Sequence, residues 1–294
     1  MSAAANRARH GTRSNWLVGL LAVLSMLTCA NAAERLVHYP NVNGLGSEGL
    51  GYKALALALK KSGQPYRLVL HDEVANIDRT RAMLEQGQVD VVDFGTSPDF
   101  ESRYGAVYFP IDRGLNGWRL LLIRAQDVPR FRGISSLTAL KAYTAGQGQN
   151  WADIAILRAA GLTVNTMPTL PDLFPTLAAQ RFDFVPLGVN EIYGLLEKYR
   201  PGKQDLVVDE HLVLVYPFGR LFFVRKDDTD LRDALLRGLT AAFDDGSYQR
   251  MLEADPAYAE ALHQANLGQR VRLLLDNPAQ TAAFRAIPRR YFLH

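Results

Sequence analysis

Short apolar runs alternate with segments of helical period along most of this chain, and this alternation limits the folds it can adopt more than any other feature. The apolar runs predict strands at residues 35–39, 66–71, 89–94, 118–124, 143–145, 182–187, 212–218 and 220–225. The segments between them predict helices at residues 49–62, 78–86, 135–141, 151–160, 173–180 and 231–244. Such alternation is typical of α/β folds, in which helices flank a mostly parallel sheet.

The order of these elements predicts two lobes, each a mostly parallel sheet flanked by helices. One set of elements gives way to a second near residue 124, and a strand within residues 216–225 brings the chain back. We therefore expect residues 33–124 and 217–294 to form lobe 1 and residues 125–216 to form lobe 2. Two crossings make a two-strand hinge, and a hinge between lobes leaves a cleft that can close on a ligand.

The first 32 residues have the pattern of a cleaved secretory signal. Arg7, Arg9 and Arg13 precede an apolar run at residues 16–27, and the small residues of the segment 30–32 follow it. This run of about 12 residues is shorter than the roughly 20 that a helix needs to span a bilayer. We expect residues 1–32 to be removed and the mature protein to reside in the periplasm.

Removal of this segment changes the charge and the cysteine content. Three of the 33 basic residues lie in it, which leaves 30 basic and 30 acidic residues, so the electrostatic footprint of a nucleic-acid-binding protein is absent. Cys29, the single cysteine, is also removed, so we expect neither disulfides nor cysteine-ligated zinc. Cys29 raises a lipoprotein alternative, but Leu27 and Thr28 fit a lipobox poorly.

Six stretches spread over about 140 residues carry a resemblance to a known family. They are residues 87–91, 95–97, 110–119, 146–153, 179–183 and 216–224. In order and spacing they resemble the type II periplasmic solute-binding proteins, in particular the amino-acid-binding components of ABC importers. The resemblance implies a two-lobed fold and capture of a small polar, anionic or zwitterionic solute by lobe closure. It also implies a monomer that delivers its solute to a membrane permease or a sensor kinase.

Two departures from the family pattern bear on the solute. In relatives that bind amino acids, an arginine of the first lobe holds the ligand carboxylate and an aspartate of the second holds the ammonium. Arg103 lies near the arginine's place but one residue late, and Gly188 stands near the aspartate's place, with Asn190 and Glu191 just beyond. The resemblance therefore does not imply an α-amino acid, although Glu191 could supply the missing charge if it points inward.

Several polar residues follow predicted strands, where open α/β sheets bind ligands. Thr96 and Ser97 follow the strand at 89–94, and their alternative role is to cap the next helix. Arg103 could bind a carboxylate through two hydrogen bonds, or it could be a solvated surface residue.

A glycine-containing turn in the second half of the chain supplies further candidates. Gln147, Gln149, Trp151 and Asp153 lie on it, at the start of a predicted helix. A plain helix cap is the alternative. We expect these residues, with Thr96, Ser97, Arg103, Asn190 and Glu191, to line the cleft.

A G-x-G-x-x-G pattern at residues 44–49 follows the first strand, and Asp72 ends the second, as in a dinucleotide-binding fold. Residues 40–43 separate the strand from the first glycine, and Asp72 is 28 residues beyond Gly44 rather than the usual distance of about 20. We therefore expect no bound cofactor and interpret the segment as a flexible loop that opens a helix.

Catalytic and metal-binding patterns are sparse. The histidines beyond residue 32 show no metal-ligand spacing, and no nucleophile elbow is present, so we assign no catalytic or metal-ligating residue. The sequence predicts an exported solute-binding protein for an ABC-type transporter or for signalling, and not an enzyme. The alternative is an exported lyase on the same scaffold, similar to cyclohexadienyl dehydratases, because fold alone does not choose between them.

Overall fold

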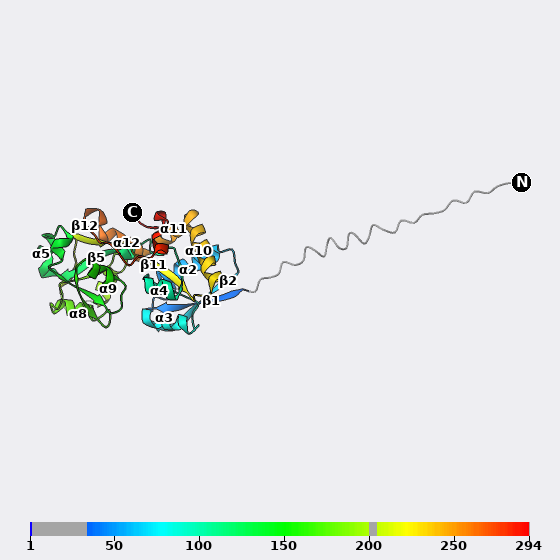
Figure 1. Ribbon diagram of the computed structural model, residues 1–294, viewed down its shortest axis with the longest axis horizontal. Helices are drawn as coiled ribbons and strands as arrows, with labels where there is room; N and C mark the ends of the chain where they lie inside the picture. Colours follow the sequence, from blue (N-terminus) through cyan, green and yellow to red (C-terminus); the bar gives the residue numbers. More distant parts are fainter. Residues whose placement is uncertain (2–33, 200–204, 294) are drawn as a thin grey trace.

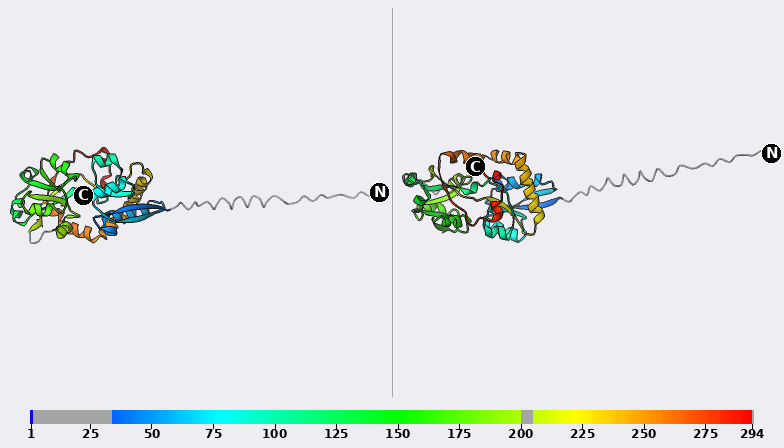
Figure 2. Two further views of the ribbon diagram at one scale, coloured as in Figure 1. Left: turned by 90° about the horizontal axis from the view of Figure 1, so that it is seen from below. Right: turned by 45° about the horizontal axis from the view of Figure 1, so that its top comes forward.

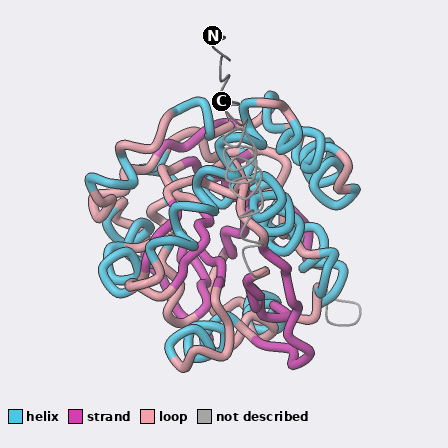
Figure 3. Tube along the Cα trace, turned by 90° about the vertical axis from the view of Figure 1, so that its right-hand side faces the viewer, coloured by secondary structure: helices cyan, strands magenta, loops and turns pink. Residues whose placement is uncertain are grey.

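The computed structural model describes Met1 and residues 34–199 and 205–293. The predicted signal segment, residues 1–32, therefore lies outside the described residues apart from Met1. Two bodies of helices and strands lie side by side along the long axis (Figure 1). In the view along that axis, helices surround most of the strands (Figure 3). This arrangement confirms the two-lobed α/β architecture.

The first lobe contains two small sheets. Strands β1 (Arg35–Val42) and β2 (Tyr66–Ala75) pair in parallel, and β11 (Arg220–Val224) pairs antiparallel with β3 (Val91–Gly95) and β4 (Gly105–Val107). The helices of this part of the chain are α2 (Leu50–Lys61), α3 (Ile77–Glu85), α4 (Pro98–Arg103), α10 (Thr229–Asp244) and α11 (Ser247–Glu253).

The second lobe contains one seven-stranded mixed sheet. Its strands, in spatial order, are β12 (Val271–Leu274), β10 (Leu212–Val215), β5 (Trp118–Arg124), β8 (Phe184–Gly188), β6 (Thr144–Gly148) and β7 (Thr163–Met167), while β9 (Leu206–Val208) also pairs with β5. The helices of this part of the chain are α5 (Val128–Arg132), α6 (Leu137–Leu140), α7 (Asp153–Ala159), α8 (Leu173–Ala178) and α9 (Ile192–Tyr199).

The chain passes between the lobes four times, not twice. It crosses just before β5 and again between β10 and β11, as expected, and both crossings join described sheets. It then returns through α12 (Pro256–Ala265) to β12, and Figure 2 (right) shows this orange segment running from one lobe to the other. A last crossing, residues 275–281, leads back to α13 (Ala282–Arg285). We call residues 275–281 the C-terminal strap.

The sheets do not follow the expected boundaries at residues 124 and 217. Strand β5 was expected in lobe 1, but it pairs with β8, β9 and β10, and all its residues are buried. Residues 271–274, which form β12, were also expected in lobe 1, but they pair with β10. For β5 the reason is that an apolar strand buried on both faces is stabilised by neighbours on either side, and these neighbours are supplied by the second-lobe sheet.

The predicted helices and strands are present, and most of the differences lie at their ends. The sequence pattern missed β4, β7, β9, β12, α4, α5, α9, α11, α12 and α13. Strand β7, with the sequence Thr-Val-Asn-Thr-Met, has exposed polar positions and lacks a run of large apolar residues. Such a strand gives little hydrophobic signal, because its place at the sheet edge requires only one buried residue.

Close contact between α2 and α10 organises the first lobe. Leu231, Leu235 and Leu239 form a buried stripe along α10. Between them, Gly238 lies so close to α2 that an added Cβ would be 1.9 Å from the carbonyl oxygen of Ala58. A side chain at residue 238 would therefore force the two helices apart.

We predict that Gly238→Ala lowers the free energy of unfolding by about 2 kcal/mol or more, because overpacking against backbone cannot be relieved by a rotamer change. Gly194→Ala in α9 is the matched control, since nothing lies within 4 Å of its added Cβ. The control should leave stability unchanged or raise it by up to about 1 kcal/mol, from helix propensity. Urea unfolding of both variants measures the effect, and equal stabilities would contradict this account of the contact.

Candidate functional site

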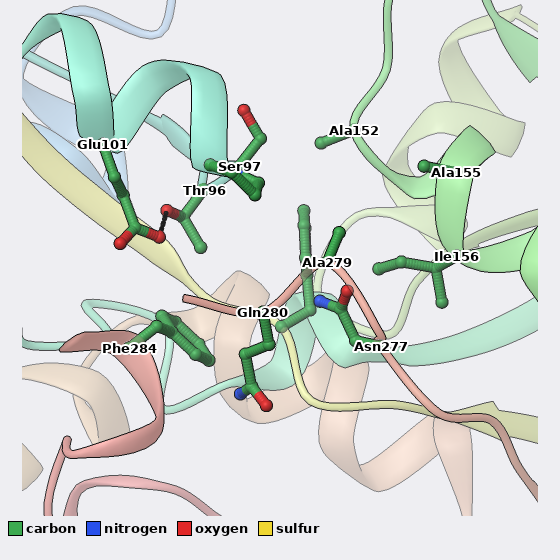
Figure 4. Close-up of a pocket in the computed structure, with 12 residues that line it drawn as sticks. Thr96, Ser97, Glu101, Ala152, Ala155, Ile156, Asn277, Ala279, Gln280 and Phe284 are labelled. Atoms are coloured by element: carbon green, nitrogen blue, oxygen red, sulfur yellow. Dashed lines mark hydrogen bonds between the residues drawn. The ribbon is translucent and has the colours of Figure 1, made fainter. Parts of the chain in front are cut away.

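A small hollow, with a cavity volume of about 50 Å³ and partly open to solvent, lies between the lobes. Thr96 and Glu101 of the first lobe line one side, Ile156 of the second lobe lines the other, and Asn277 and Gln280 of the C-terminal strap lie between them (Figure 4). We call it the strap-side hollow. Because it takes residues from both lobes, any change in the angle between the lobes alters its shape.

The start of α4 places Thr96 and Ser97 at this hollow, as the sequence predicts. Ser97 is the N-cap of α4, and its hydroxyl oxygen accepts a hydrogen bond from the backbone N–H of Phe100. Thr96 is buried, and its hydroxyl donates to Oε1 of Glu101 at 2.7 Å (Figure 4). Ser97 thus performs the capping role that was the alternative reading, while it also lines the hollow.

Glu101 was not singled out from the sequence, yet it is the only charged residue among the described residues that line the strap-side hollow. Its carboxylate accepts hydrogen bonds from three hydroxyls: those of Thr96, Tyr108 and Thr281. Burial and then the neighbouring Glu101 charge raise the pKa of Tyr108 to about 12, so this hydroxyl remains a donor at neutral pH. Thr281 belongs to the C-terminal strap, so the carboxylate also ties the strap to the first lobe.

A buried ionic cluster lies in the second lobe, where β5 begins. Arg119 donates to Asp153, to Oε1 of Glu191 at 3.0 Å and to the hydroxyl of Tyr216 at 3.0 Å. Tyr216 in turn donates to Asp153 at 2.6 Å. We call these four residues the Arg119 cluster. It brings the predicted residues Asp153 and Glu191 together, but it turns Asp153 inward and away from solvent.

Two members of the cluster, Arg119 and Tyr216, have raised pKa values. Burial alone would lower the pKa of the Arg119 guanidinium, but Asp153, Tyr216 and Glu191 together outweigh burial and raise it. Burial, followed by the charge of Asp153, raises the pKa of Tyr216 well above its usual value, although Arg119 opposes this shift. The cluster therefore keeps a positive arginine and a protonated tyrosine over the whole physiological pH range.

Gly188, at the place where the family pattern has an aspartate, is covered by oxygen atoms. An added Cβ would lie 2.9 Å from Oδ1 of Asn190 and 3.0 Å from Oε1 of Glu191. The same Glu191 oxygen accepts a hydrogen bond from the backbone N–H of Gly188 at 2.9 Å. Asn190 Oδ1 is buried and has no partner among the described residues. Asn190 and Glu191, which follow the strand, thus fold back over the space that a side chain at residue 188 would fill.

The segment from Gln147 to Trp151 lies between the lobes only in part. Gln147 is fully buried and donates to the carbonyl of Pro186, where proline leaves the β6–β8 ladder incomplete. Gln149 is exposed. The Trp151 indole packs over Gly148, where an added Cβ would come within 2.4 Å of the ring. The next residue, Ala152, lines the strap-side hollow.

Arg103 lies outside the strap-side hollow. Its guanidinium is 3.5 Å from the carboxylate of Asp99, and both side chains are more than half exposed. With Arg81 and Asp78 it lines a second hollow, to which Asn150 of the other lobe also contributes. The predicted residues thus do not share one site, and the structure does not bring Arg103 together with Thr96, Ser97 and Asp153. Four of them line neither hollow and lie outside the Arg119 cluster: Gln147, Gln149, Trp151 and Asn190.

In the part of the chain that the structure describes, no metal site or membrane-spanning helix accompanies these features. In residues 34–199 and 205–293, no group of three or more histidine, cysteine or acidic side chains is placed to hold a metal ion. Over the same residues, no helix combines the length and the apolar character needed to cross a bilayer.

Comparison with known proteins gives matches only at the level of structure. No family model matches this sequence. No curated protein sequence matches it significantly.

Solved structures resemble the chain along most of its length. An amino acid ABC transporter substrate-binding protein from Streptococcus pneumoniae, bound to L-arginine, has a TM-score of 0.53 and 13% identity over 75% of this chain and 93% of its own. A mutant of ArgBP from T. maritima has a TM-score of 0.52 and 17% identity over 74% and 93%. The GluR0 ligand-binding core from Nostoc punctiforme, in complex with L-glutamate, has a TM-score of 0.50 and 14% identity over 76% and 100%.

These neighbours define the fold. The chain has the two-lobed fold of the type II periplasmic solute-binding proteins, as the resemblance implied. Sequence identities this low establish the fold but not the solute, which has to be inferred from this chain's own residues.

We predict that Asp153→Asn lowers the free energy of unfolding by about 3–5 kcal/mol, because it leaves the buried Arg119 charge short of a partner. Asp99→Asn, which breaks the exposed pair with Arg103, should change it by less than about 0.5 kcal/mol. Chemical denaturation of both variants tests this. Equal, small effects would show that the Arg119 cluster does not hold the second lobe together.

Proposed function

We propose that this protein binds a small solute between its lobes, without chemical turnover, and passes it on to a membrane partner. The observation that carries the proposal is the strap-side hollow, whose walls come from both lobes and from the strap. A hollow built in this way changes shape when the lobes move, so a ligand that contacts both walls favours one lobe angle over others.

The role outside the cytoplasm is part of the same proposal. The basic segment, short apolar run and small residues of positions 1–32 support export. The neighbours in fold include a substrate-binding protein of an amino acid ABC transporter and the GluR0 ligand-binding core, and both names support a binding role, with a permease or a sensor as the partner. A role limited to binding the solute, without chemical turnover, is consistent with either partner.

The lining of the strap-side hollow does not favour an anionic solute. None of its described lining residues is basic, and Arg103, the residue predicted to bind a carboxylate, is paired with Asp99 at the other hollow. The guanidinium of Arg119 is already satisfied by two carboxylates. A neutral or cationic polar solute therefore fits the described residues better than the anion expected from the sequence.

We predict that one class of small polar solute raises the melting temperature of the refolded, ligand-free protein, because a ligand that binds only the folded state stabilises it by mass action. At 100 times Kd the gain is about 2.7 kcal/mol. Thermal-shift screening of amines, amino acids, dicarboxylates and sugars measures it, and mass spectrometry of the mixture checks for product. A flat response to all classes, or accumulation of product, contradicts the proposal.

Lobe closure can be followed through tryptophan fluorescence. Trp151 is partly exposed and precedes a residue of the hollow, whereas Trp118 is buried and stacks with Arg272. We predict that a solute changes the emission of the wild type and of Trp118→Phe, but not that of Trp151→Phe. If the solute-dependent change in emission remains in Trp151→Phe and disappears in Trp118→Phe, the solute does not alter the surroundings of Trp151, which would contradict the prediction.

A further inference from the structure

The charge balance of the strap-side hollow indicates what kind of solute it accepts. Glu101 is its one charged group among the described lining residues, and no basic side chain forms an ion pair with it in the described part of the chain. Its three partners are hydroxyls, which are neutral. A carboxylate that is partly withdrawn from water and has no cationic partner is stabilised when a cation binds next to it.

The hydrogen-bonding capacity of Glu101 is also incomplete. A carboxylate offers about four acceptor positions. Tyr108 and Thr281 donate to Oε2, whereas only Thr96 donates to Oε1. One acceptor position therefore remains on Oε1, in a carboxylate that three hydroxyls already hold in a defined orientation.

The rest of the lining suits the body of a small organic cation. Phe218, Phe284 and Ile156 provide apolar surface, and aromatic faces also attract ammonium and guanidinium groups. Asn277 and Gln280 provide neutral amides on the strap, between the walls formed by Glu101 and Ile156 (Figure 4). Nothing in this lining offers a positive partner to a carboxylate of the solute.

We infer that the strap-side hollow selects a small organic cation, an amine or a guanidine without a carboxylate, and that Glu101 binds its charged group. This inference rests on the proposed function and narrows it to a solute class. It differs from amino-acid capture because no positively charged side chain among the described lining residues would pair with an α-carboxylate. Glu101 is here a specificity-determining residue, since its carboxylate contacts the positively charged group of the solute.

Titration calorimetry with three probes tests the inference: n-butylamine carries an ammonium group, agmatine a guanidinium and an ammonium group, and L-arginine adds a carboxylate. We expect the wild type to bind n-butylamine or agmatine more tightly than L-arginine. Glu101→Gln should weaken binding of that amine at least tenfold, because it keeps a hydrogen-bond acceptor and removes the charge. Glu85→Gln is the matched control, a first-lobe carboxylate outside this hollow that also accepts a hydrogen bond from a tyrosine, Tyr104.

A second variant keeps the test decisive if Glu101→Gln does not fold. Ala155 is exposed on α7 and lines the same hollow from the other lobe, so Ala155→Lys supplies an internal cation without disturbing the core. It should abolish binding of the amines, whereas Ala155→Gln should not. Retained amine binding in both Glu101→Gln and Ala155→Lys would overturn the inference.

The binding results distinguish failure of the cation site from failure of the solute-binding function. If neither amine binds but a neutral or anionic solute does, the cation site is wrong and the solute-binding function stands. If no solute of any charge binds to the ligand-free protein, the function itself is wrong. Tighter binding of L-arginine than of agmatine would also overturn the inference, because it would require a carboxylate partner that the described lining lacks.

Discussion

An arginine paired with a buried aspartate, which also accepts a hydrogen bond from a tyrosine, secures each of the first two crossings between the lobes. In the second lobe Arg119, the second residue of β5, binds Asp153 and Tyr216. In the first lobe Arg220, the first residue of β11, binds Asp93, which also accepts a hydrogen bond from Tyr39. Gly51 gives this second group room, because an added Cβ would overlap the Asp93 carboxylate. Each of these two crossings thus leads into a strand, and an ion pair at the first or second residue of that strand holds it in its lobe.

This anchoring determines where the protein can bend. Breaking a buried ion pair costs several kcal/mol, far more than rotating a few exposed backbone bonds. The strands β5 and β11 therefore move with their own lobes, and bending is confined to the short segments just before them. The strap restricts this motion further, because Asn277 bonds to the carbonyl of Pro217 and Thr281 to Glu101. Solute binding at Glu101 and the position of the strap are consequently linked through one carboxylate.

The sequence predicted the two lobes and most of their elements because hydrophobic period is a local property, read within about 11–18 residues. The site was harder to predict. Arg119 is 34 residues from Asp153 and 97 from Tyr216, and only the fold brings them together. A charged residue in the apolar run at 118–124 was a usable signal for a buried ion pair, whereas nothing local marks Glu101. Arg103 follows the family spacing closely, but a shift of one residue on a short helix turns it toward another hollow.

The late strand β12 has a consequence for how the chain reaches its native state. It forms the edge of the second-lobe sheet next to β10, and α13, still further along, packs Phe284 near Gly219 of the first lobe. Neither lobe can therefore be completed before residues beyond 270 are available. The contacts that finish both lobes are long-range, which slows folding. A growing chain thus stays incompletely folded until nearly all of it has been synthesised, a state compatible with passage through a translocation channel as an extended polypeptide.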